Sequence, residues 1–303
     1  MTVAERRRRY VSDVIALHDR ISLRGFASQV SPDSVLYRAR RPDGLLVMAV
    51  RNDGIPDRYL LGIHGFRLAE YLRLRFASDE VAFDRALFAE PAGGHANEIH
   101  VLALDEESGT ILRYVSLVGS ADAVPMAPRD PARTPFPSEV VHGINLFDHV
   151  DVDPGIDTTQ IWEIKRLVHR GSRAGSDLVG RLRLTLELML GFYTALSRVD
   201  PPVRVIVGDG EERVAIARLL RSLRDITVIE GTTPSLPKDD LLYPRYAYAS
   251  RDVVKAFVVR VPQGEELRQL SEHLRRALAN PNPLLGFKEL VSQVGGQLRR
   301  VHI

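Results

Sequence analysis

The residues with the clearest chemical potential lie together in Ile161–Val168, which reads IWEIKRLV. Its β-branched and apolar residues predict a strand, and the alternation of side chains along a strand places Glu163 and Lys165 on one face. The same alternation places four residues on the other face: Trp162, Ile164, Arg166 and Val168. Charges on a buried strand must be paired or used. The pattern therefore predicts either a structural ion-pair network or the working centre of the protein.

A basic loop rich in small residues follows this strand and reads HRGSRAG over residues 169–175. A helix is predicted after it, over residues 176–198. Backbone N–H groups at a helix N-terminus, together with the positive end of the helix dipole, favour bound anions. Arg170 and Arg173 add positive charge to the loop. The segment predicts a phosphate or pyrophosphate site, and a loop with two solvated arginines is the alternative.

The composition excludes several other kinds of site. The chain has 303 residues and no cysteine, which rules out disulfides, thiolate-ligated metals and cysteine nucleophiles. A net charge of +2 gives no support for a nucleic-acid partner. The N-terminus lacks the apolar region of a secretory signal, and no apolar run is long enough to span a bilayer. We therefore expect a cytoplasmic protein that has no membrane span and binds no nucleic acid.

The patterning along the rest of the chain predicts one mixed sheet with helices around it. Strands are predicted at residues 35–40, 45–50, 98–105, 110–118, 160–168, 203–207, 226–230 and 253–261. Helices are predicted at residues 4–22, 58–77, 79–89, 176–198, 211–223, 264–279 and 286–299. Turn signals at residues 41–44 and 106–109 join the first four strands into two hairpins. Alternation of strand and helix after residue 160 implies crossover connections, so the fold class is α/β.

The order of hairpin, glutamate-bearing strand, basic loop and helix resembles the GCN5-related N-acetyltransferase (GNAT) superfamily. The closer likeness is to acyl-homoserine-lactone autoinducer synthases, and it spans roughly residues 45–232. The segments that carry it are Tyr71–Phe76, Glu98–Val118, the proline-rich stretch Pro125–Pro137, and the strand with Trp162, Glu163 and Arg166. The stretch Glu90–Asn97 lacks the paired acidic residues with which those synthases hold S-adenosylmethionine.

The resemblance implies a GNAT-like domain over residues 41–261, with a mostly antiparallel mixed sheet, between helical extensions at residues 1–40 and 262–303. The implied reaction moves an acyl group from acyl-CoA or an acyl carrier protein (acyl-ACP) to an amine of a small molecule or peptide, without a metal. Glu163 is the implied base, and Arg166 would orient the acceptor or hold Glu163. Backbone N–H groups near Leu167 and Val168 would polarise the thioester carbonyl. The implied phosphate-binding residues are Arg170, Gly171, Ser172, Arg173, Ala174 and Gly175.

Two other functions stay open. One is a catalytically idle module with a GNAT fold that binds an acyl thioester or a partner protein. The other is a nucleotide- or S-adenosylmethionine-dependent enzyme built on Gly208-Asp209-Gly210, although this stretch is an incomplete G-x-G-x-x-G motif and a tight strand-to-helix turn is the favoured interpretation. The aromatic and basic stretch at residues 241–248 either closes over a site or packs the C-terminal extension, and packing is favoured.

Overall fold

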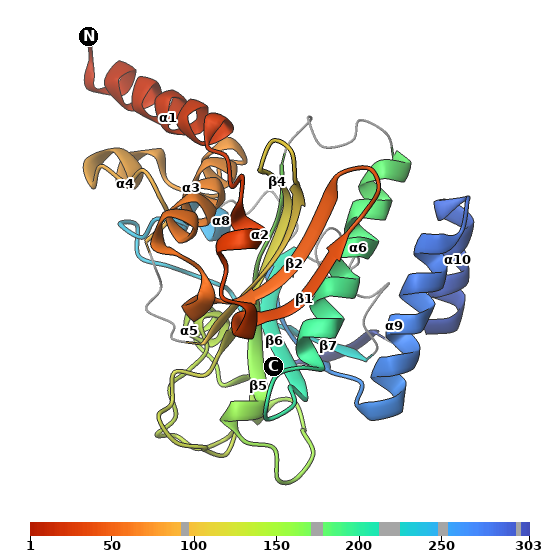
Figure 1. The fold of residues 1–303 in the computed structure, drawn as a ribbon. Helices are drawn as coiled ribbons and strands as arrows, with labels where there is room; N and C mark the ends of the chain where they lie inside the picture. Colours follow the sequence, from red (N-terminus) through yellow and green to blue (C-terminus); the bar gives the residue numbers. More distant parts are fainter. Residues whose placement is uncertain (92–96, 171–177, 212–224, 248–253, 295–297) are drawn as a thin grey trace.

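In the part of the chain that the structure describes, nine strands form one sheet with helices on both of its faces (Figure 1). The computed structural model describes the whole chain except residues 92–96, 171–177, 212–224, 248–253 and 295–297. The strands are β1 (Val35–Arg40), β2 (Leu45–Arg51), β3 (Glu98–Asp105), β4 (Thr110–Gly119), β5 (Ile161–His169), β6 (Val205–Glu211), β7 (Ile226–Glu230), β8 (Val254–Arg260) and β9 (Leu298–His302). Their spatial order is β1-β2-β3-β4-β5-β6-β8-β7-β9.

Among the described strands most neighbours are antiparallel, whereas β5/β6 and β7/β9 are parallel pairs. The first five strands follow the chain in order, and β1/β2 and β3/β4 are the two hairpins that the turn signals predict. The helix between β5 and β6 supplies the crossover that a parallel pair needs. The predicted α/β class, with a mostly antiparallel mixed sheet flanked by helices, is confirmed. The arrangement is compatible with a GNAT-like fold, although the sheet of this chain is large.

The helices divide between the two faces of the sheet. Their bounds are α1 (Val3–Arg20), α2 (Phe26–Gln29), α3 (Asp57–Arg73), α4 (Asp79–Asp84), α5 (Pro137–His142), α6 (Leu178–Leu196), α8 (Tyr243–Ala247), α9 (Gly264–Ala279) and α10 (Pro283–Val294). One apolar cluster joins α6, α9 and α10 to one sheet face, and a second joins α1, α3 and α4 to the opposite face. Short 3-10 turns lie at Pro32–Ser34, Asn52–Gly54, Leu146–Asp148 and Thr158–Gln160.

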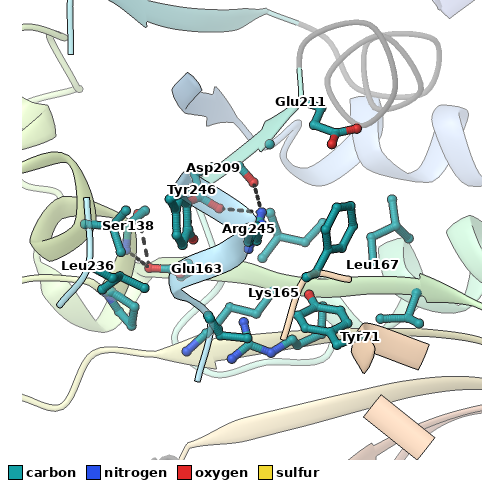
Figure 2. A pocket seen from close by; sticks show the side chains of 18 of the residues that line it. Tyr71, Ser138, Glu163, Lys165, Leu167, Asp209, Glu211, Leu236, Arg245 and Tyr246 are labelled. Atoms are coloured by element: carbon teal, nitrogen blue, oxygen red, sulfur yellow. Dashed lines mark hydrogen bonds and ion pairs between the residues drawn. The ribbon is translucent and has the colours of Figure 1, made fainter. Parts of the chain in front are cut away.

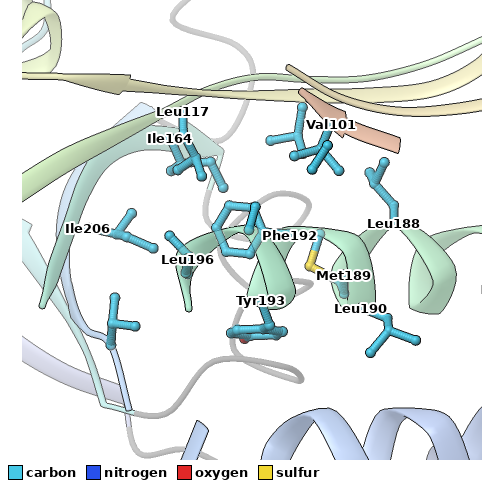
Figure 3. Close-up of a cluster of buried hydrophobic side chains, with 14 of the residues drawn as sticks. Val101, Leu117, Ile164, Leu188, Met189, Leu190, Phe192, Tyr193, Leu196 and Ile206 are labelled. Carbon is cyan, nitrogen blue, oxygen red and sulfur yellow. The ribbon is translucent and has the colours of Figure 1, made fainter. Parts of the chain in front are cut away.

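Strand β2 shows why its sequence is a continuous apolar run. Leu45, Val47 and Ala49 lie in the cluster under α6, and the residues between them lie in the cluster under α3. A strand covered on both faces has no polar side. Helix α6 forms the centre of the first cluster, where Phe192 and Tyr193 are fully buried (Figure 3).

The chain ends differ in part from what the sequence predicted. The last helix was expected to reach residue 299, but α10 ends at Val294 and residues Leu298–His302 form β9, parallel to β7. The edge of β7 offers free backbone groups, and pairing with them overrides a weak helical pattern. The domain boundaries after residues 40 and 261 stay a prediction. Strand β1 of the first segment pairs with β2, and β9 of the last segment pairs with β7.

Candidate active site

A cavity of about 580 Å³ lies where β5 and β6 part. These two parallel strands pair through only three residue pairs, of which the last is Glu163↔Val207. Beyond that point β5 continues beside β4, whereas β6 continues beside β8. The cavity occupies the space between the diverging strands, and residues 163–169 and 209–211 line its two sides. Helix α8 and the loop before it close the cavity over the sheet (Figure 2).

Gly208 lies on β6 just after the point of divergence. A side chain at this position would place its Cβ 3.0 Å from Ile164 Cγ2 and 3.1 Å from the Ile164 carbonyl oxygen. Glycine therefore lets the two strands stay close immediately below the cavity. The sequence predicted a strand-to-helix turn at Gly208-Asp209-Gly210, and that prediction is wrong. These residues belong to β6, which runs to Glu211 and pairs with Phe257, Ala256 and Lys255 of β8.

A β-bulge interrupts β5 on its other edge. The pairing with β4 runs from Ser116↔Lys165 to Tyr114↔Val168, so two residues of β5 stand opposite one residue of β4. Arg166 takes the left-handed conformation there, with φ of 58°. An extra residue advances the side-chain alternation by one. Val168 therefore lies in the α3 cluster and Leu167 packs against the α6 cluster.

The bulge overturns the predicted faces of the strand. Alternation alone placed Arg166 and Val168 with Trp162 and Ile164, which do lie in the α6 cluster. The Arg166 guanidinium instead lies 5.4 Å from the ring centre of Tyr71, on helix α3. Glu163, Arg166 and Val168 thus belong to the side of the sheet on which α3 packs.

Glu163 lies at the inner end of the cavity and is 4% exposed. One of its carboxylate oxygens accepts hydrogen bonds from the backbone N–H and the hydroxyl of Ser138, both at 3.1 Å (Figure 2). Burial raises the pKa of this carboxyl from 4.5 to about 7, against the opposing effects of the Lys165 ammonium and the Ser138 hydrogen bonds. A carboxyl poised near neutral pH can both accept and release a proton.

Arg166 is held by a buried ion-pair network below the cavity. Its Nε donates to Glu90 at 2.7 Å, and Arg67 donates to the second oxygen of Glu90, also at 2.7 Å. Arg67 further contacts Glu98 and the Tyr114 hydroxyl. Burial alone would raise the pKa of Glu90, but the two guanidiniums hold that pKa well below its usual value. The predicted contact of Arg166 with Glu163 is not formed, and its charge is neutralised by Glu90.

A second charged group faces Glu163 across the cavity. Asp209 of β6 accepts a hydrogen bond from Arg245 at 2.8 Å and one from the Tyr246 hydroxyl at 2.7 Å (Figure 2). Both partners lie on α8 and line the cavity. The expectation that residues 241–248 only pack the C-terminal extension is therefore wrong for these two side chains. Sequence reasoning named this stretch but could not connect it to Asp209, because Arg245 and Tyr246 follow Asp209 by 36 and 37 residues.

The predicted ligand-binding residues differ in where they lie relative to the cavity. Leu167 and Val168 line the cavity. Arg170 is buried, and its guanidinium donates to the Asp19 carboxylate of α1 at 3.0 Å and to the Asp19 carbonyl at 3.2 Å. The remaining five, Gly171, Ser172, Arg173, Ala174 and Gly175, lie outside the described residues.

The described ranges hold neither a metal site nor a membrane-spanning helix. No group of three or more histidine, aspartate or glutamate residues is arranged to hold a metal ion there. The acidic loop around residues 148–157 uses its carboxylates locally: Asp151 pairs with Arg129, and Asp153 pairs with Arg204. None of the described helices combines the length and apolar character needed to cross a membrane.

No protein-family model matches the sequence, and no curated protein is similar to it. Among solved structures, one similar chain is a point mutant of a cAMP-binding acyltransferase from Mycobacterium smegmatis, with 9% sequence identity and a TM-score of 0.28. The alignment covers 93% of this chain and 60% of that protein, so the chain spans about three fifths of the length of its neighbour. A likeness this low carries no argument about activity, which rests on the geometry of the site.

Proposed function

We propose that this protein is an acyltransferase that moves an acyl group from a thioester, carried by coenzyme A or by an acyl carrier protein, to an amine of a small molecule or peptide. The observation that carries the proposal is the cavity between β5 and β6, with Glu163 at its inner end and a bulge in its wall. Cavities that hold small molecules have volumes of about 300–1,000 Å³, and this one is within that range.

The thioester arm is placed along the free edge of β5. Past Glu163 this edge has no ladder with β6, so an extended amide-containing chain such as pantetheine can lie against it as a further strand would. The bulge turns the backbone at Arg166 and Leu167 out of the regular β4 register. Backbone N–H groups of Leu167 and Val168 are the assigned donors to the thioester carbonyl oxygen, where negative charge develops as the amine attacks.

Glu163 is assigned the role of base. An attacking amine must lose a proton, and a carboxyl whose pKa is about 7 is half ionised at neutral pH. Ser138 fixes one oxygen of this carboxyl, which leaves the other available to an acceptor or a water molecule. Arg166 is a positioning residue in this scheme: through Glu90 and the Tyr71 ring it holds the bulge that orients the two N–H groups.

The finer likeness to autoinducer synthases is also part of the proposal. Its support is the Trp162-Glu163 sequence, of which Glu163 lines the cavity, and the engagement of Arg166 in the network beneath it. Glu90 and Glu98 are two acidic residues close to the position of the family's acidic pair, but both are bound to Arg67. We therefore take from this likeness only the proposal that the acyl donor is a thioester. The identity of the acceptor amine is left to experiment.

The experiment measures binding and turnover separately. Thermal unfolding is recorded with coenzyme A, acetyl-CoA and S-adenosylmethionine, since a ligand at a hundredfold excess over its Kd stabilises the native state by about 2.7 kcal/mol. Release of free thiol from acyl-CoA is then followed with a pool of amines, for the wild type, Glu163→Gln and the control Glu107→Gln on the exposed β3–β4 turn.

Removing a general base lowers the rate by roughly 10²–10⁴-fold, and we expect this loss for Glu163→Gln alone. Full turnover in Glu163→Gln would refute the role of the carboxyl. Stabilisation by acyl-CoA without turnover of any amine would favour the idle binding module, and stabilisation only by S-adenosylmethionine would favour the nucleotide-type alternative.

A further inference from the structure

Lys165 is a charged residue of the cavity to which the proposed reaction assigns no role. It lies on β5 two residues after Glu163, it is partly buried, and it lines the cavity (Figure 2). The other cations nearby have partners, since Arg166 binds Glu90 and Arg245 binds Asp209. Within the described ranges, no hydrogen bond or ion pair reaches the Lys165 ammonium. A partly buried ammonium that makes no direct hydrogen bond or ion pair is costly, so its presence calls for a use.

The surroundings of this amine favour its neutral form. Burial lowers the pKa of Lys165, and the neighbouring Arg166 guanidinium lowers it further, while Glu163 acts in the opposite direction. A lysine that is desolvated and next to another cation is the usual arrangement for a nucleophilic amine. Glu163 lies on the same face of the strand before the bulge and can take up the proton that the ammonium gives away.

We propose that Lys165 is a site of self-acylation, at which the enzyme transfers the acyl group of a bound thioester to its own side chain when no free amine is present. The inference rests on the proposed function, because it requires the same thioester in the same cavity. Its geometric support is the position of Lys165: it lines the cavity on β5 between Glu163 and the bulge, which is the part of the wall where the proposed reaction puts the acceptor amine.

The chemical step balances without any further reactant. Glu163 accepts one proton from the ammonium, and the neutral Nζ attacks the carbonyl carbon of the thioester. The carbon–sulfur bond breaks as the carbon–nitrogen bond forms. The nitrogen releases its second proton, which the leaving thiolate takes up, so the products are a free thiol and an acyl-lysine amide. This amide is stable, and it fills acceptor space, so the modified protein is switched off.

The composition of the chain makes this modification easy to locate. There are only four lysines, Lys165, Lys238, Lys255 and Lys288. Lys238 and Lys288 are exposed and report the uncatalysed reaction of acetyl-CoA with surface amines. Lys255 is bound to Glu230 at 3.0 Å, outside the cavity, and Lys255→Arg is the matched control variant.

The test incubates the full chain with acetyl-CoA alone and follows acetylation of each lysine by peptide mass spectrometry. We expect Lys165 to gain one acetyl group at least about tenfold faster than Lys238 or Lys288, as for an activated amine against solvated ones. Glu163→Gln should slow this labelling, Lys165→Arg should abolish it, and Lys255→Arg should leave it unchanged. Preincubation with acetyl-CoA should lower the later rate with a free amine in the wild type but not in Lys165→Arg.

Equal labelling of Lys165 and the surface lysines would overturn the inference, and so would an unmodified Lys165 in a protein that acylates free amines. In both cases the proposed function stands. Failure to bind acetyl-CoA or to consume it with any amine would instead count against the proposed function. Tryptophan fluorescence of Lys165→Arg establishes that loss of labelling does not come from unfolding.

Discussion

Replacing Glu163 with Gln should change the pH dependence of stability in a way that can be worked out from its burial. The pKa of this carboxyl is raised from 4.5 to about 7 because burial disfavours its charged form. The folded state therefore holds the proton more tightly than the unfolded state. The contribution of Glu163 to stability is fully present below pH 4.5, is lost as pH rises through about 7, and stays lost above it.

The size of this effect follows from the shift. One pKa unit corresponds to about 1.4 kcal/mol, so raising the pH across the window should cost the wild type about 3 kcal/mol in free energy of unfolding. Glutamine resembles the protonated carboxyl and can still accept the Ser138 hydrogen bonds. The difference in free energy of unfolding between Glu163→Gln and the wild type should therefore be near zero in acid. In mild alkali the variant should be more stable than the wild type by about 3 kcal/mol.

The assay is urea unfolding at about pH 5 and about pH 8, on either side of most of the titration. Trp162 is the only tryptophan, is buried and lies next to residue 163, so its fluorescence reports on the strand directly. The exposed Glu107→Gln control should give the same difference from wild type at both pH values. Parallel pH profiles for wild type and Glu163→Gln would show that the carboxyl titrates normally, and the reasoning about the base would fall with it.

Three further outcomes are expected. Wild-type turnover should rise with pH through about 7, where Glu163 loses its proton, and the rate of Glu163→Gln should be flat over the same range in thiol-release assays. Glu90→Gln should lower the free energy of unfolding by about 3–5 kcal/mol, because Arg67 and Arg166 lose the charge that compensates them. Denaturant unfolding measures this loss, and a loss below about 1 kcal/mol would contradict the importance of the buried network. Gly208→Ala should lower the free energy of unfolding by about 1–3 kcal/mol and should lower turnover, since the new Cβ would lie 3.0 Å from Ile164. Unchanged stability and rate would show that β5 can shift there without cost.

A matched comparison supports the Glu90 experiment. Glu80 also pairs with an arginine, Arg7, but its side chain is 63% exposed. Exposed ion pairs contribute about 0–1 kcal/mol, so Glu80→Gln should be nearly neutral. If Glu80→Gln lowered the free energy of unfolding as much as Glu90→Gln, burial would not be the reason for the large contribution of the Glu90 network.

The sequence was a good guide where local pattern decides structure. The continuous apolar run of β2 and the turn at residues 41–44 predicted the first hairpin, and Gly44 takes the positive φ of 81° that this turn needs. Glu163 was proposed as a candidate because a carboxylate on an apolar strand is conspicuous, and its side chain is buried and lines the cavity. Its partner Ser138 was not identified, because a hydrogen bond between residues 25 positions apart leaves no periodic signal.

The failures arose where distant pairing sets local structure. Arg166 was assigned to the wrong face because a bulge depends on the register with β4, and strand alternation cannot reveal it. The Gly208-Asp209-Gly210 stretch looked like a turn because glycine usually weakens strands, but pairing with β8 keeps it extended. Asp209 acquired its position at the cavity only through α8, which follows much later in the chain.

The short ladder between β5 and β6 has a mechanical consequence. Three residue pairs join the two strands there, whereas seven join β2 to β3 and seven join β6 to β8. We therefore expect the sheet to behave as two panels that meet at a narrow hinge, with Trp162 at its middle residue pair. Small rotations about this hinge alter the width of the opening above it at the expense of very few hydrogen bonds. Backbone amides of Ile161–Glu163 should therefore exchange with solvent faster than those of β3.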